Sequence, residues 1–209
     1  MTCNDTRESH TLMTVRRTNV VEYRDGSVRF LAGLTVDADG APRAYGPAGT
    51  QPLDYLANAG SPGRWWGIAT DTSGKPFIQK EHDPAPGYYV STTSYQRSGF
   101  AICDPRRYVD SEKVPFVVVP APLRKMVKGI VLGCAATITR GSSGESIACV
   151  VADFGPAKHL GEASIAAARM LEVPCNPKTG GSDRQDFTYT FFPGIAAVIN
   201  GETFKLIPA

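Results

Sequence analysis

The stretch that most constrains the fold is residues 146–171, which read SIACVVADFGPAKHLGEASIAAARML. It begins with an apolar run of strand length at 147–152, and this run ends on Asp153. A Phe-Gly-Pro break follows, and from residue 161 apolar side chains recur at a spacing of three, which indicates an amphipathic helix. The stretch therefore predicts a buried strand ending on one acid, and a helix with a second acid, Glu162, in its first turn.

Turn-forming residues occur along the whole chain, with 21 Gly and 16 Pro among 209 residues. This distribution favours short strands joined by turns over a helical bundle. The length suffices for a sizeable core, and no linker or internal repeat interrupts it. We expect a mainly β, single-domain barrel over residues 19–209 with one principal helix at about 161–172. Residues 1–18 are expected to be poorly ordered or partly extended, and the first ten frayed.

Further strands are predicted where apolar or alternating runs lie between turn signals. These runs are 27–36, 65–70, 76–79, 88–95, 114–120, 129–139, 187–192, 195–199 and 203–207. Asp39-Gly40 predicts a tight turn after the first run, residues 141–144 predict a hairpin, and Asn200-Gly201 predicts the last one. Residues 41–63 are expected to form a long irregular surface segment, of the kind that often carries binding groups.

Charge and hydropathy exclude several partners. A formal charge of +2 and scattered basic residues do not indicate nucleic-acid binding. No segment approaches the roughly 20 apolar residues of a membrane helix, and residues 1–17 lack the apolar core of a signal peptide. We therefore expect no nucleic acid and no membrane as partners, and no Sec-type signal, while the oligomeric state stays open.

Cysteine and histidine do not mark a reactive centre. The five cysteines are odd in number and form no CxxC pair, so neither a zinc site nor a complete disulfide framework is indicated. Cys134 and Cys149 lie in apolar runs and are expected to be reduced and buried. None of the three histidines stands in a recognisable nucleophile motif. We expect no metal and no other cofactor.

Carboxylates are the remaining candidates for chemistry. Asp153 and Glu162 lie nine positions apart and can face a common cleft, as acid/base hydrolysis of a glycosidic bond requires. Asp37 precedes a turn and can point into the same cleft, whereas Asp39 has a good purely structural explanation as a turn residue.

Aromatic side chains provide candidate sugar contacts. Trp65 and Trp66 are adjacent, so on a strand one faces the core and the other is exposed, where its indole can stack on a sugar ring. Tyr89 belongs to the strand predicted at 88–95, whose hydroxyl side chains would line one face. We take all three as candidates for substrate binding, against plain core packing.

Five segments are similar to a known enzyme family: TVDADGAPRAYGP (35–47), PLDYLANAG (52–60), IQKEHDPAPGYYVSTTSY (78–95), RYVDSEKVPFVVVP (107–120) and VVADFGPAKHLGEASIAAARML (150–171). On these, roughly residues 27–200 resemble family 75 of the glycoside hydrolases, the fungal-type chitosanases and their bacterial relatives. At the centre of the family pattern a strand ends in Asp-x-Gly-Pro, and Gly-Glu-x-Ser follows. The chain matches this pattern at Asp153, Gly155, Pro156, Gly161, Glu162 and Ser164.

The resemblance implies endo-hydrolysis of a β-1,4-linked glucosamine polymer with inversion, by a metal-free pair at Asp153 and Glu162. It also implies a double-psi barrel, and places Asp37 and Asp39 in an acidic turn that contributes to the cleft together with Ser164. Relatives tend to carry Gly-Asp where this chain has Gly133-Cys134, and fungal forms carry Cys in place of Ala38. Extracellular or cell-wall action is implied by the resemblance alone.

Two alternatives and one assignment stay open. The first alternative is that the polymer is peptidoglycan, reached without Sec export. The second is that the protein is a catalytically inactive carbohydrate- or partner-binding protein. A helix dipole would favour an ionised Glu162 by roughly 0.3–1 kcal/mol, whereas burial can raise a carboxyl pKa by several units. Burial therefore favours Glu162 as the acid and Asp153 as the base or water-positioning group.

Overall fold

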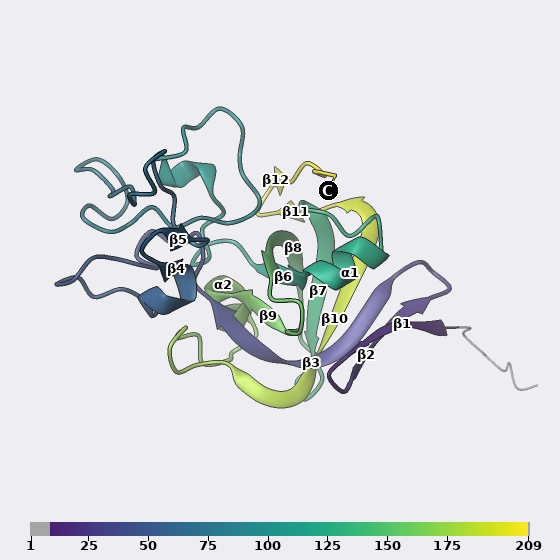
Figure 1. The fold of residues 1–209 in the computed structure, drawn as a ribbon. Helices are drawn as coiled ribbons and strands as arrows, with labels where there is room; N and C mark the ends of the chain where they lie inside the picture. Colours follow the sequence, from purple (N-terminus) through teal and green to yellow (C-terminus); the bar gives the residue numbers. More distant parts are fainter. Residues whose placement is uncertain (1–8, 209) are drawn as a thin grey trace, which may run out of the picture.

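The computed structural model describes residues 9–208. At its centre six strands pair in a ring that closes through a contact between the first and the last of them (Figure 1). In ring order they are β3 (Val28–Asp37), β10 (Ser182–Ala196), β7 (Cys134–Arg140), β8 (Ser146–Gly155), β6 (Phe116–Pro120) and β9 (Glu162–Ser164). The mainly β, single-domain barrel is thus confirmed.

The strand pairing of the barrel has an internal twofold symmetry. The symmetry exchanges β3 with β8, β6 with β9, and β7 with β10. Under this exchange the parallel pair β3–β9 becomes the parallel pair β8–β6, and the antiparallel pair β3–β10 becomes the antiparallel pair β8–β7. This is the topology expected of a double-psi barrel. Asp37 pairs with Ser164 and Asp153 pairs with Val118, one position beyond the central pair Val117–Ala163 in each case. Asp37 and Asp153 therefore hold corresponding positions in the two halves.

The interior of the barrel is filled by apolar side chains. Phe116, Val117, Ile138 and Phe191 have no exposed surface, and the rings of Phe30 and Tyr189 stack at 4.9 Å, with Phe191 beside them. Burying an apolar side chain of this size stabilises the fold by about 1.5–3 kcal/mol relative to exposure. The barrel is thus a packed scaffold, and its strand ends are rigid supports for polar groups.

The principal helix is shorter than predicted. The prediction of about 161–172 is wrong at both ends, because α2 runs only from Ile165–Met170, and Glu162 lies in strand β9. The Ser164 hydroxyl accepts a hydrogen bond from the backbone N–H of Ala167 at 3.1 Å and so caps the helix start. Residues 162–164 pair instead with the end of β3. A second short helix, α1 (Ala121–Met126), follows β6.

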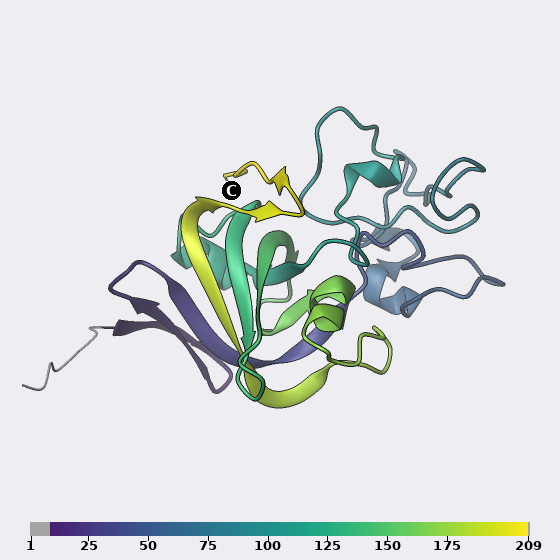
Figure 2. The ribbon, with the colours of Figure 1, turned by 180° about the vertical axis from the view of Figure 1, so that it is seen from behind.

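Residues 38–115 form what we call the loop lobe, which lies on one side of the barrel in both views (Figures 1 and 2). Its regular elements are short: η1 (Leu56–Ala59), β4 (Gly60–Ser61), β5 (Arg64–Trp65) and η2 (Pro105–Arg107). The strands predicted at 65–70, 76–79 and 88–95 are wrong, since beyond Trp65 at the end of β5 only isolated bridges such as Ile68–Ser91 form there. Gly67 interrupts the first of these segments and Pro76 begins the second, where neither favours a continuous ladder.

The chain ends contribute two hairpins. β1 (Ser9–Val15) and β2 (Thr18–Tyr23) extend the sheet beyond β3, so residues 9 and 10, predicted to be frayed, begin a strand, while residues 1–8 lie outside the described part of the chain. β11 (Val198–Ile199) and β12 (Glu202–Thr203) form the hairpin predicted from Asn200-Gly201. Between residues 9 and 208, no helix has the length and apolar character required to cross a bilayer.

Candidate active site

A cleft of about 460 Å³ opens where the barrel meets the loop lobe. Its walls include Asp37, Asp153 and Glu162 from the barrel strands, and Asp39 and Asp54 from the loop lobe. No lysine, arginine or histidine is among the described residues that line it. The four predicted acids, Asp37, Asp39, Asp153 and Glu162, are therefore brought together in a cleft of strongly acidic character.

Asp153 is held by hydrogen bonds on the β8 side of the cleft. One carboxylate oxygen accepts from the Ser94 amide at 3.0 Å, the Ser94 hydroxyl at 2.5 Å and the Phe154 amide at 2.7 Å. Burial raises the pKa of Asp153 to about 6, while these hydrogen bonds act in the opposite direction by stabilising the carboxylate. Asp153 is thus oriented, and it is ionised over much of the neutral range.

Glu162 has a different environment on β9. Burial, followed by the charges of Asp153 and Asp54, raises its pKa to about 7. Within the described contacts its carboxylate accepts no hydrogen bond, and it lies in β9 rather than in the first turn of α2. A side chain at Gly155 would reach within 3.1 Å of Glu162 Oε2, so the glycine leaves room for this carboxyl group. Glu162 is the better proton donor of the two.

Asp37 and Asp39 lie at the end of β3. The Asp39 amide donates to Asp37 Oδ1 at 2.8 Å, and the Tyr45 hydroxyl donates to Asp39 Oδ1 at 2.6 Å. The predicted turn is present, with Gly40 at a φ of +80°. Burial is the main cause that raises the pKa of both carboxyl groups. The charge of Asp39 raises the pKa of Asp37 further, and the charge of Asp153 raises that of Asp39. Asp39 is thus both a turn residue and part of the cleft.

Asp37, Asp39 and Asp153 also form the tightest acidic group of the site. One oxygen of each lies within 4.8 Å of the others. Calcium takes six to eight oxygen ligands, which is more than these three residues present as single ligand atoms. We assign no metal to these three residues.

The exposed tryptophan on the cleft rim is Trp66, with 67% of its surface accessible. Its indole N–H donates to the backbone carbonyl of Asn58 at 2.8 Å. The side-chain amide of Asn58 donates to both carboxylate oxygens of Asp54, at 2.9 and 3.0 Å. This chain of hydrogen bonds fixes the indole at the rim. The prediction that one of the two adjacent tryptophans is exposed is confirmed.

Three predicted substrate contacts lie elsewhere. Trp65 is partly buried and packs on Tyr89 with ring centroids 6.5 Å apart, and neither residue lines the cleft. Ser164 is buried, and its hydroxyl caps α2 and accepts from the Phe116 amide at 3.0 Å. The structure gives these three side chains packing and capping contacts.

Sequence reasoning missed three polar groups of the site: Tyr45, Asp54 and Ser94. All three come from the loop lobe, where no periodic pattern indicates which side chains point inward. Tyr45 and Asp54 lie within the motifs that carry the family resemblance, and that was the one signal available for them. Ser94 lies in the hydroxyl-rich run 91–95, which marks a polar face without selecting a residue.

Cys134 and Cys149 are buried and free, as predicted, and burial raises the pKa of Cys134 to about 11. Neither residue lines the cleft. The other described cysteines, Cys103 and Cys175, are also free. Cys3 lies outside the described residues.

The site as a whole combines an oriented carboxylate, a carboxyl group with a pKa near neutrality and an exposed indole around one open cleft. Such a set can protonate one atom of a bound sugar chain while activating water at another. Comparison with protein-family models and with curated proteins finds no match.

Proposed function

We propose that the protein is an endo-acting, inverting glycoside hydrolase that cleaves a β-1,4-linked hexosamine polymer of the chitosan type. The observation that carries this proposal is that Asp153 and Glu162 line one cleft in different environments. Hydrolysis of a glycosidic bond with inversion needs two such carboxyl groups, one protonated and one ionised.

The environments favour one division of roles. Glu162 accepts no hydrogen bond among the described contacts and has a pKa of about 7, so it retains a proton near neutral pH and donates it to the leaving oxygen. Asp153 accepts three hydrogen bonds that stabilise its ionised form, so it orients and deprotonates the attacking water. Asp37 and Asp39 extend the acidic wall beside this pair.

The charge of the cleft favours a cationic substrate. The cleft wall holds five carboxyl groups and no basic side chain, so those that are ionised, Asp153 among them, attract the protonated amines of glucosamine units. The same field opposes the free carboxylates of the peptide stems of peptidoglycan, which therefore ranks second. Trp66 offers an apolar face on which a sugar ring can stack at the rim.

The test is the release of reducing ends from partially acetylated chitosan and from purified peptidoglycan. We expect turnover of chitosan by the native protein, and a loss of roughly 10²–10⁴-fold in Asp153→Asn and in Glu162→Gln. The matched control is Glu145→Gln, because Glu145 is an exposed acid just before β8, at the opposite end of the strand from Asp153.

Each alternative has its own outcome. Turnover of peptidoglycan alone would replace the substrate and keep the acid pair. Binding of chitosan without turnover would favour a carbohydrate-binding protein, and full activity in both active-site variants would eliminate the pair.

A further inference from the structure

The loop lobe contains a network that connects the C-terminal hairpin to the cleft. We propose that Ser94 is a positioning residue for Asp153, and that Arg97 and Tyr95 support Ser94 by anchoring it to the segment around Glu202 and Lys205. The role of Asp153 as the base rests on the proposed function. The contacts that position Asp153 do not depend on the reaction.

Ser94 provides two of the three hydrogen bonds that Asp153 accepts. Its amide and its hydroxyl both reach Oδ1, at 3.0 and 2.5 Å, so they fix the carboxylate in direction as well as in position. The Ser94 hydroxyl also accepts from the Phe154 amide at 3.3 Å, which ties it to the backbone beyond Asp153. Two donors from one residue leave the other carboxylate oxygen free of these contacts to meet a water molecule.

The residues on either side of Ser94 are themselves fixed. The Tyr95 amide donates to the Ala152 carbonyl at 2.8 Å, beside Asp153 on β8. The Thr93 hydroxyl donates to the Tyr95 carbonyl at 2.8 Å and accepts from the Val109 amide at 3.0 Å, so Ser94 lies within a small closed turn. Thr93 and Tyr95 are both buried, which protects this turn from water.

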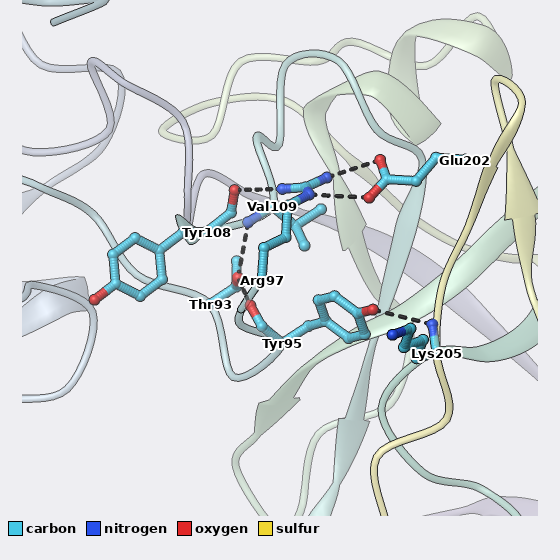
Figure 3. Close-up of polar contacts among 7 residues, drawn as sticks. All are labelled: Thr93, Tyr95, Arg97, Tyr108, Val109, Glu202 and Lys205. Atoms are coloured by element: carbon cyan, nitrogen blue, oxygen red, sulfur yellow. Dashed lines mark hydrogen bonds and ion pairs between the residues drawn. The ribbon is translucent and has the colours of Figure 1, made fainter. Parts of the chain in front are cut away.

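The support reaches the C-terminal hairpin through two side chains (Figure 3). The Arg97 guanidinium donates to both oxygens of Glu202 at 2.9 and 3.0 Å, and to the Tyr108 carbonyl at 2.8 Å. The Tyr95 hydroxyl accepts from the Lys205 amide at 3.1 Å, and its ring packs edge-on against Phe204. A segment more than a hundred residues away in sequence thereby holds the turn that carries Ser94.

The network has a chemical consequence at the cleft. The groups that face Asp153 are the acids Asp37, Asp39 and Glu162; burial opposes the ionisation of Asp153, and its charge in turn raises the pKa of each of these three acids. Hydrogen bonds that favour the carboxylate therefore come from Ser94 and the Phe154 amide. Removing the Ser94 hydroxyl should raise the pKa at which Asp153 loses its proton, because the charged form loses a donor.

The first test is Ser94→Ala beside Ser94→Thr, which keeps the hydroxyl. We expect the carboxyl carbon of Asp153, followed by NMR, to titrate about one pH unit higher in Ser94→Ala, and to return toward the native value in Ser94→Thr. The acidic limb of the pH–rate profile should move by the same amount and in the same direction. An unchanged NMR titration in a folded Ser94→Ala protein would overturn the proposal, and this readout stays valid if the protein hydrolyses no sugar.

The second test separates the support from a general effect on the loop lobe. In Glu202→Gln we expect the Tyr95 amide to exchange about two- to fivefold faster with solvent, because a partly exposed ion pair contributes modestly. The matched control is Arg106→Gln, which removes a different arginine–carboxylate pair, Arg106–Asp104 at 2.7 Å, which lies in the loop lobe and outside this network. Equal exchange of Tyr95 in the native protein and in Glu202→Gln, or equal acceleration in both variants, would contradict the support.

Discussion

The barrel and the loop lobe contribute to the cleft in different ways. Strand pairing in the barrel sets the positions of Asp37, Asp153 and Glu162, because each is fixed by backbone hydrogen bonds to a neighbouring strand. The loop lobe provides side chains that modify these acids or border them, such as Ser94 and Trp66. The barrel therefore fixes where the acids lie, whereas the lobe sets their hydrogen bonding and the shape of the rim.

Among substitutions that keep all the acids, the largest effect should follow from crowding an acid within the barrel. A methyl group at Gly155 would lie 2.8 Å from Val118 Cγ1 and 3.1 Å from Glu162 Oε2, so Gly155→Ala displaces the carboxyl group. We expect kcat on chitosan to fall roughly 10- to 100-fold, as small displacements of reacting groups do. The variant is compared with the native protein by steady-state kinetics.

Gly144→Ala is the matched control for this variant. Gly144 lies in the turn before β8, and an added methyl group there meets no atom within 4 Å. Its φ of +73° makes the substitution costly for stability without touching the cleft. A normal kcat in Gly155→Ala would show that Glu162 does not need the space beside this glycine.

Substitution of one fully buried valine in each region compares how much the barrel and the loop lobe contribute to stability. Val117→Ala in β6 should lower the free energy of unfolding by about 2–3 kcal/mol, since it leaves a cavity in the main core. Val90→Ala affects a small separate cluster with Ala69 and Tyr108. We expect it to accelerate exchange of the Ala69 amide, which donates to the Val90 carbonyl, with a smaller change in global stability.

Denaturant unfolding and amide exchange measure both valine variants. An equal loss of global stability in the two would show that the barrel and the loop lobe unfold as one unit. The distinction between scaffold and accessory region would then apply to the site only, and not to folding.

Substitution of each tryptophan separates the role of the cleft rim from that of the packing inside the loop lobe. Trp66→Ala should raise KM for chitosan about three- to tenfold with little change in kcat, because it removes a stacking surface at the rim. Trp65→Ala removes packing against Tyr89 and should lower stability instead. The opposite pattern, with KM raised only by Trp65→Ala, would place the sugar on the other side of the lobe.

The smallest expected effect is that of a chelator. Asp37, Asp39 and Asp153 meet where the barrel joins the lobe, and the proposed mechanism uses them as carboxyl groups without an ion. We expect hydrolysis rates to be unchanged after treatment with EDTA. A loss of rate that is restored by adding back a divalent cation would require a metal in the mechanism.

Much of the barrel was predictable from the sequence because buried strands carry local signals. The apolar run before Asp153, the β-hairpin at 141–144 and the final Asn200-Gly201 turn all appear as expected. The start of α2 was misplaced because Gly161–Ser164 fits a helix by local pattern, and the parallel pairing with β3 that makes residues 162–164 a strand is a long-range interaction.

The loop lobe was predicted less well for a physical reason. Its backbone is fixed by isolated bridges and by side chains from distant segments, and none of these contacts leaves a periodic pattern in the sequence. Asp54 and Ser94 are therefore indistinguishable from other polar loop residues until the chain is folded. The acids of the barrel were identified correctly as neighbours, whereas the groups that tune them were not.

The pH dependence of kcat/KM on chitosan tests the central claim most directly. The base must be ionised and the acid protonated, so the rate should rise through about pH 6 with Asp153 and fall above about pH 7 with Glu162. Because the two groups are close, these limbs belong to the pair as a whole. We expect a bell-shaped dependence of kcat/KM on pH with its maximum between pH 6 and pH 7. A value of kcat/KM that stays constant or rises steadily from pH 5 to pH 9 would contradict the roles given to Asp153 and Glu162.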